Sequence, residues 1–304
     1  MGGECGCGFA RGRNVPFQVY GAFKGCTSIF IYPGYKFKDK VILVLADGEK
    51  VGMTKIRQDS MRLGTAIVMG QEDRLVYDSD SEQKDSVVFE ESEINKIITT
   101  TGGFYTLVLS DGTRVWLNSE SELEYPVLFG KGKRVVKLTG EAFFEVTKDA
   151  SRPFIVETND IRTRVLGTSF NVNTYDKDYI ETVLVRGSVG VQVNGDSQEW
   201  RIRPNELARL DRKSKTGEVK EVDILPYVTW KEGHFLFKNQ SLEQIMNIMA
   251  RWYDIEVEFQ DESIRNLHFT GDIKRHADFS VILKALTSSV DVDYKLNGRE
   301  LILY

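Results

Sequence analysis

The sequence predicts a mainly β protein that ends in a small α+β domain. Between residues 99 and 222, short runs rich in Val, Ile, Phe and Tyr alternate with turn residues such as Gly102-Gly103 and Asn194-Gly195. Closely spaced strands with such turns are typical of all-β sandwiches, jelly rolls and rolls. After Asp223 the apolar residues recur every three or four positions, which indicates helices. We therefore expect an all-β domain over residues 41–225 and an α+β domain over residues 226–304.

The first 40 residues have a different composition from the rest of the chain. They contain all three cysteines, Cys5, Cys7 and Cys26, and many glycines. One Cys-Gly-Cys pair with a single distant cysteine does not match the usual zinc spacings, so we expect no metal and no cofactor. We expect this segment to be poorly ordered. No apolar run reaches the length of about 20 residues that spans a membrane, and no signal-peptide core is visible.

Composition limits the classes of function. The 304 residues are 41% hydrophobic and 28% charged, a usual balance for a globular protein with a sizeable core. The net charge of -5 gives no general attraction for phosphates, so we expect no nucleic acid partner. The acidic run from Asp78 to Asp85 lacks the glycine and terminal glutamate of a calcium loop, and we interpret it as a solvated loop.

Two hairpins begin the all-β region. Asp111-Gly112 stands between apolar runs and favours a tight turn, and Asp47-Gly48 repeats this pattern upstream. Further strands are expected at residues 104–109, 114–117, 134–138, 142–146, 154–158, 163–166, 169–175, 179–185, 188–193 and 207–210. We expect no helix in this region.

The carboxyl-terminal domain has a β-α-β, β-α-β-β pattern. Ser241 and Gln244 form a predicted capping box that starts a helix ending near Tyr253-Asp254. The apolar face of this helix is formed by Leu242, Ile245, Met246, Met249 and Trp252. A second helix is expected at residues 279–288, and a hairpin turns at Asn297-Gly298. The remaining strands are expected at residues 233–238, 255–259, 268–273, 292–296 and 301–303.

A set of motifs in this order resembles the FecR family of transmembrane sigma regulators, which are anti-sigma factors, particularly its Bacteroidetes branch. The motifs lie at residues 101–105, 109–118, 121 with 125–126, 134–146, 153–156, 165–172, 184–189, and 230 with 233–237. The family-motif residues are Asp111, Gly112, Trp116, Leu117, Asn118, Gly140, Glu141, Phe144, Val146, Gly167, Thr168, Phe170, Asn171, Gly187, Val189 and Trp252, and we expect mainly structural roles for them. The carboxyl-terminal part is similar to the short N-terminal domain of secretins and TonB-dependent transporters.

The resemblance implies a signalling protein without enzymatic activity. It implies a location at the periplasmic face of the inner membrane and two partners: the signalling domain of a TonB-dependent outer-membrane transporter and an extracytoplasmic-function sigma factor. Such proteins begin with a helical cytoplasmic segment and a membrane helix, and residues 1–40 resemble neither. For partner binding we propose the strand formed by Phe269, Thr270, Gly271, Asp272 and Ile273, whose edge would accept an extended segment.

Several residues leave alternatives open. Glu141 and Glu145 share one strand face and could form an acid and base pair in a carbohydrate-binding or glycan-cleaving β-sandwich. The favoured interpretation places both in solvent, or has Glu141 accept backbone bonds at the Gly140 turn. His234, His268 and His276 match no metal motif and are interpreted as surface or partly buried residues. For Trp116 and Trp252 we favour core packing over a binding role. Gly167-Thr168 and Gly187-Ser188 are interpreted as bends rather than phosphate nests.

Overall fold

In the computed structural model, the chain forms two compact units, and the boundary between them lies between Glu232 and Gly233. The structure describes residues 14–16, 40–52, 61–63, 66–71, 74–79, 93–275 and 277–304, and gives only the backbone for 14–16, 61–63, 66–71 and 74–79. The expectations for the three cysteines, His276, and most of residues 1–40 and 78–85 lie outside this part of the chain. Within it, no helix has both the length and the apolar character needed to span a bilayer.

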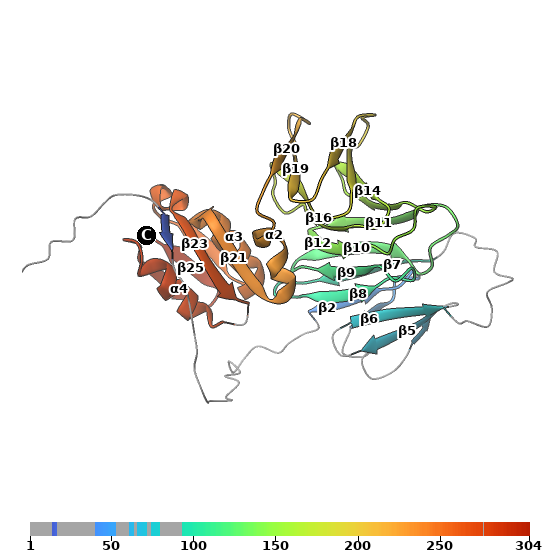
Figure 1. The fold of residues 1–304 in the computed structure, drawn as a ribbon. Helices are drawn as coiled ribbons and strands as arrows, with labels where there is room; N and C mark the ends of the chain where they lie inside the picture. Colours follow the sequence, from blue (N-terminus) through green and yellow to red (C-terminus); the bar gives the residue numbers. More distant parts are fainter. Residues whose placement is uncertain are drawn as a thin grey trace, which may run out of the picture. The chain divides into compact units, whose positions relative to one another are not determined.

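The first unit, which we call the β unit, consists of two large sheets (Figure 1). The nine-stranded sheet has the order β18-β17-β14-β13-β11-β10-β7-β2-β3. Its strands are β2 (Val41–Val44), β3 (Lys50–Gly52), β7 (Ile94–Thr99), β10 (Ser121–Pro126), β11 (Arg134–Thr139), β13 (Phe154–Glu157), β14 (Ile161–Val165), β17 (Val189–Val193) and β18 (Glu199–Ile202).

The ten-stranded sheet has the order β20-β19-β16-β15-β12-β9-β8-β6-β5-β4. Its strands are β4 (Met61–Leu63), β5 (Ala66–Gln71), β6 (Arg74–Ser79), β8 (Tyr105–Val108), β9 (Arg114–Leu117), β12 (Glu141–Glu145), β15 (Ser169–Asn173), β16 (Tyr179–Arg186), β19 (Glu206–Asp211) and β20 (Gly217–Glu221). The mainly β architecture expected from the sequence is confirmed, and the described residues between 99 and 222 contain no helix.

The core of the β unit is formed by the apolar side chains that alternate along these strands. Phe144 of the ten-stranded sheet stacks on Phe170, with ring centroids 5.1 Å apart, and approaches Phe154 of the nine-stranded sheet at 6.1 Å. All three rings are fully buried. The aromatic contact between β12 and β13 therefore joins the two sheets.

The other face of each sheet has a different composition. On the nine-stranded sheet, which carries what we call the charged face, aligned residues form a row across the strands: Gln192, Arg162, Glu157, Lys137, Glu124 and Lys96. On the ten-stranded sheet, which carries what we call the covered face, the aligned row is Thr106, Trp116, Phe143, Asn171, Val183 and Leu207. Two short helices, α2 (Leu225–Val228) and η2 (Thr229–Glu232), follow β20 and end the β unit.

The second unit contains residues 233–304 and the amino-terminal strand β1 (Asn14–Pro16). Its elements are β21 (His234–Ser241), α3 (Leu242–Tyr253), β22 (Glu256–Phe259), the 3-10 helix η3 (Glu262–Asn266), β23 (His268–Lys274), α4 (Phe279–Thr287), β24 (Tyr294–Asn297) and β25 (Glu300–Leu303). They form two three-stranded sheets, ordered β1-β23-β21 and β22-β25-β24. The predicted order of strands and helices is confirmed, with η3 as an addition that the sequence did not indicate.

Local signals explain the helix boundaries of this unit. The Ser241 hydroxyl accepts a hydrogen bond from the Gln244 backbone at 3.2 Å, and the Gln244 side chain accepts one from the Ser241 backbone at 3.2 Å. This is the predicted capping box, and α3 ends at Tyr253 because Asp254 has a left-handed backbone, with φ of 58°. The apolar stripe of α3 is buried at Leu242, Ile245, Met246 and Met249.

Candidate functional site

Three of the motif residues meet around one buried carboxylate on the covered face. The Asn118 amide donates to Glu141 Oε2 at 2.6 Å, and the Asn171 amide donates to Glu141 Oε1 at 2.8 Å. Glu141 lies on β12, Asn171 on the neighbouring β15, and Asn118 directly after β9 on the other side. Because all three side chains are buried, the carboxylate obtains from the two asparagines the hydrogen bonds that water would otherwise supply.

A serine and a tyrosine support this cluster from the backbone side. The Glu141 backbone N–H donates to Ser121 Oγ at 2.9 Å, and the Tyr175 hydroxyl lies 2.9 Å from the same oxygen. Gly140 precedes Glu141 with φ of 90°, and a Cβ there would lie 2.3 Å from Ser121 Oγ. Only glycine fits this turn, since a side chain would meet both a strained backbone and an occupied space.

These contacts correct the sequence-based interpretation of Glu141. Its carboxylate is buried rather than in solvent, and its two oxygens accept from asparagine side chains on the flanking parts of the sheet. Glu145 lies four residues further along β12, which places the two residues about 13 Å apart at the usual rise of a strand. The arrangement therefore gives no support to an acid and base pair.

The Asp111-Gly112 turn contains a second buried charge. Asp111 Oδ2 accepts from Arg134 Nη1 at 2.7 Å and from the Thr113 hydroxyl at 2.7 Å. Both charged side chains are almost completely buried, and Arg134 also donates to the Arg152 carbonyl at 2.9 Å. The sequence indicated a turn but not this pair. The available signal was the position of Arg134, two residues before the core residue Val136 on the same strand face.

The other motif residues of the β unit have packing roles. Gly167 passes the Lys148 backbone so closely that a Cβ would lie 2.7 Å from the Lys148 Cα, and Thr168 donates to the Ser188 carbonyl at 3.0 Å. These contacts join consecutive bends, including the one at Gly187. The remaining motif residues lie in the core between the sheets: Leu117, Phe144, Val146, Phe170 and Val189.

The covered face is packed against the helices that end the β unit. Trp230 of η2 is buried, and its ring meets Phe104 edge-on with centroids 6.1 Å apart. The Lys231 ammonium lies 5.7 Å from the Trp116 ring and 5.1 Å from the Phe143 ring. Trp116 therefore lies on the covered face and not in the core between the sheets. Its ring centroid is 5.7 Å from that of Phe143 on the same face. The segment 225–232 therefore forms part of a second, smaller core.

An ion pair lies beside this second core. Arg209 binds Glu181 through Nε at 3.0 Å and Nη2 at 2.7 Å, and its guanidinium lies 4.5 Å from the Tyr179 ring. Burial raises the pKa of Glu181, although Arg209 opposes the rise. Burial also raises the pKa of Tyr227 on α2 to about 12, and Glu181 adds to this rise. Because these groups alter one another's pKa values, we infer that they share an environment of low polarity.

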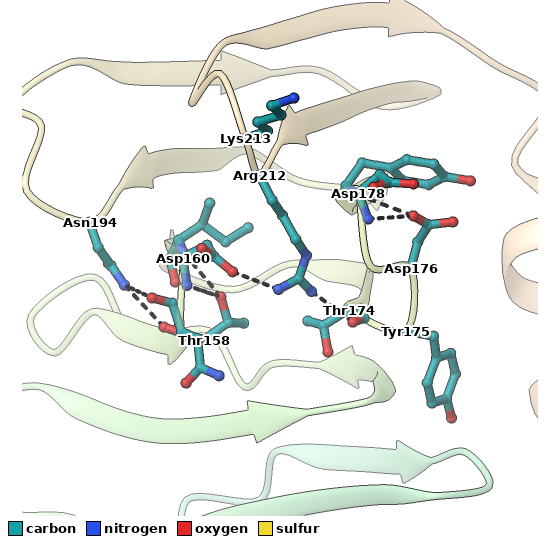
Figure 2. A network of polar contacts seen from close by, with 12 residues as sticks. Thr158, Asp160, Thr174, Tyr175, Asp176, Asp178, Asn194, Arg212 and Lys213 are labelled. Atoms are coloured by element: carbon teal, nitrogen blue, oxygen red, sulfur yellow. Dashed lines mark hydrogen bonds and ion pairs between the residues drawn. The ribbon is translucent and has the colours of Figure 1, made fainter.

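Loops from both sheets are joined by the polar network shown in Figure 2. Arg212, after β19, donates to Asp160 at 2.7 Å and to the Thr174 carbonyl at 2.8 Å. Asn194 donates to the Thr158 carbonyl at 3.1 Å. Asp160 lies in the turn between β13 and β14 of the nine-stranded sheet, and Arg212 follows β19 of the ten-stranded sheet, so the network connects the two sheets. Among the described residues, no group of His, Cys, Asp or Glu is arranged to hold a metal ion.

The predicted partner-binding strand is β23. It pairs with β21 in antiparallel orientation on one side and with β1 in parallel orientation on the other, at His268, Phe269 and Thr270. Along Gly271, Asp272 and Ile273, no strand of the described chain pairs with that second side. Phe269 and Ile273 are buried, whereas Thr270 is half-buried and Asp272 is exposed.

The histidines and Trp252 of this unit have separate surroundings. His234 Nδ1 lies 3.0 Å from Asp272 Oδ1, and His268 Nδ1 lies 2.7 Å from the Asn266 carbonyl, so the two rings have different partners. Trp252 meets Phe235 edge-on at 5.4 Å and lies under Arg275 at 4.9 Å. These contacts give Trp252 a packing role.

Comparison with known proteins gives a consistent result for both units. The model described as "FecR protein" matches residues 95–190, and the model described as "FecR, C-terminal" matches residues 234–303. Two crystal structures of a candidate anti-sigma factor from Parabacteroides distasonis ATCC 8503, at 1.65 and 2.50 Å resolution, are similar to this chain. Each has a TM-score of 0.62 and 27% sequence identity, and covers 69% of this chain and 98% of its own. No curated protein matches.

Proposed function

The chain belongs to the FecR family of anti-sigma factors, and from this premise we propose that it is the periplasmic, signal-transducing part of such a regulator. In this proposal the chain senses the state of a TonB-dependent outer-membrane transporter and regulates an extracytoplasmic-function sigma factor. It is associated with the inner membrane and acts through protein contacts rather than through catalysis. The site geometry agrees with this role, because the buried polar residues of the motifs bind one another.

The edge of β23 is the observation that carries the proposal. An edge strand with unpaired backbone groups accepts an extended segment of another protein, and neighbouring side chains then provide selectivity. The β23 edge already pairs with the three residues of β1, which supports its ability to accept a strand. A transporter segment would replace β1 and extend the pairing along Gly271, Asp272 and Ile273.

A binding measurement with the full chain tests this proposal. The probe is the purified signalling domain of a TonB-dependent transporter from the same organism, titrated by isothermal calorimetry. Thr270→Lys places a charge on the β23 edge and should weaken binding at least tenfold, because lysine on an edge strand opposes strand addition. The matched control is Leu296→Lys, which places the same charge on β24, the outer strand of the other three-stranded sheet.

Equal affinities of the wild type and Thr270→Lys would contradict the assignment of the β23 edge. Absence of binding by the wild type would contradict the proposed transporter partner. Far-UV circular dichroism of each variant separates loss of binding from loss of folding. A reporter gene under the control of the cognate sigma factor then provides a test of the regulatory role, since Thr270→Lys should uncouple its expression from transporter ligand.

A further inference from the structure

The strand β20 (Gly217–Glu221) is an exposed edge on the β unit that the proposed function does not use. All five of its residues are exposed, and it forms the end of the ten-stranded sheet. Within the described chain only β19 pairs with it, and the β19–β20 hairpin projects from the body of the sheet (Figure 1). A long exposed edge of this kind offers backbone donors and acceptors to another strand.

The side chains of β20 include two opposite charges placed on either side of Val219. Glu218 and Lys220 lie on the covered-face side of the sheet, opposite Arg209 and Leu207 of β19. Val219 lies on the other side, opposite Ala208, and is 42% exposed although Ala208 and Leu210 on that face of β19 are in the core. The strand therefore has an acidic residue before Val219 and a basic residue after it.

We propose that β20 pairs in antiparallel orientation with β20 of a second copy of this chain, centred on Val219. In this register each Glu218 faces the Lys220 of the other copy, and the two Val219 side chains face each other. Opposite charges that face each other across strands stabilise a sheet, and apolar cross-strand pairs do the same. The result is a two-fold symmetric dimer in which the two ten-stranded sheets continue into each other.

Charge order also selects this register over the alternatives. A parallel, in-register pairing would place Glu218 against Glu218 and Lys220 against Lys220. An antiparallel pairing shifted by two residues would place one of these residues against its own copy. Like charges in facing positions destabilise a sheet, so both of these alternatives are disfavoured relative to the pairing centred on Val219. In each single chain, Lys220 Nζ lies 3.1 Å from Glu218 Oε1, and the dimer would exchange these two intrachain contacts for two contacts between copies.

Charge reversal gives a test that does not depend on the stability of any one variant. Sedimentation equilibrium of the full chain should show a reversible dimer for the wild type. Glu218→Lys and Lys220→Glu should each weaken self-association at least tenfold, because each makes both charged positions alike. An equimolar mixture of the two variants should associate again, and the double variant Glu218→Lys/Lys220→Glu should dimerise like the wild type.

The matched control is Lys137→Glu, which makes the same change of net charge as Lys220→Glu, at a side chain that is 66% exposed on a strand in the interior of the nine-stranded sheet. It should leave the dimer unchanged. The proposal is overturned by a wild type that stays monomeric up to millimolar concentration, by single variants that associate like the wild type, or by a mixture that does not associate. Far-UV circular dichroism confirms that each variant is folded before these outcomes are compared.

Discussion

The two outer faces of the β unit differ in almost every physical property, although each belongs to a sheet of similar size. The charged face has rows of ion pairs in contact with solvent, such as Lys96 with Glu124 at 2.8 Å. The covered face has aromatic and aliphatic side chains, a buried glutamate between two asparagines, and the packed segment 225–232. One face of the sandwich is therefore solvated, and the other forms a second core.

This difference shows where the family motifs act. Asn118, Glu141, Asn171 and Trp116 all lie on the covered face or at its margin, and the described part of the charged face contains none of the motif residues. The segment 225–232 that packs on this face leads directly to Gly233, where the second unit begins. The motifs therefore support the packing of segment 225–232 on the β unit, in addition to the core between the sheets.

The largest expected effect comes from removing the main apolar contact of segment 225–232. Trp230→Ala should lower the free energy of unfolding by about 3–5 kcal/mol, the usual cost of truncating a buried tryptophan. Urea denaturation followed by far-UV circular dichroism measures this change. Trp230→Phe retains a ring beside Phe104 and is the control, which should recover more than half of the loss. A cost below about 1 kcal/mol for Trp230→Ala would mean that the segment is not part of a core.

The buried carboxylate should have the next largest effect. Glu141→Ala leaves the amides of Asn118 and Asn171 without their acceptor, and it should cost about 3 kcal/mol. The same truncation on the charged face, Glu122→Ala, should cost about 1 kcal/mol or less, because Glu122 is partly in solvent. Both are measured by urea denaturation at neutral pH. Equal costs for the two variants would remove the distinction between the faces.

Alkaline pH should act on the covered face through Tyr227. Its folded pKa of about 12 lies above the ordinary value of 10, so the folded chain keeps the phenol proton longer than the unfolded chain does. The associated stability is complete below pH 10 and is lost as the pH rises from about 10 to 12. Two pKa units correspond to at most about 2.7 kcal/mol. Tyr227→Phe should flatten the loss of stability between pH 10 and pH 12, and an unchanged slope would contradict the burial of this hydroxyl.

The smallest effect is expected on the charged face. Lys96 contacts both Glu122 and Glu124, and its pKa is raised mainly by the hydrogen bond to Glu122. Lys96→Ala should nevertheless cost less than about 1 kcal/mol, because its side chain and those of its partners are about one-third exposed. The difference from the wild type should shrink further in 1 M NaCl. A large cost that does not depend on salt would show that this face is also packed.

The sequence predicted the features that depend on neighbouring residues. The capping box of Ser241, the apolar stripe of α3 and the turn at Asp111-Gly112 each need only a few consecutive positions, and all three are confirmed. The carboxylate cluster joins Glu141 to Asn118 and Asn171, which are 23 and 30 residues away. Such contacts require the order of strands in the sheet, which periodicity within one strand does not contain.

The pairing of Asp111 with Arg134 has a consequence for how the β unit folds. Asp111 lies in the turn between β8 and β9 of the ten-stranded sheet, whereas Arg134 begins β11 of the nine-stranded sheet. Neither sheet alone can remove both charges from water and satisfy them. A half-formed sandwich would keep the two groups hydrated, and their burial becomes favourable only as the sheets close. The pair therefore makes closure of the two sheets a cooperative step and penalises a single sheet that collapses onto a wrong surface.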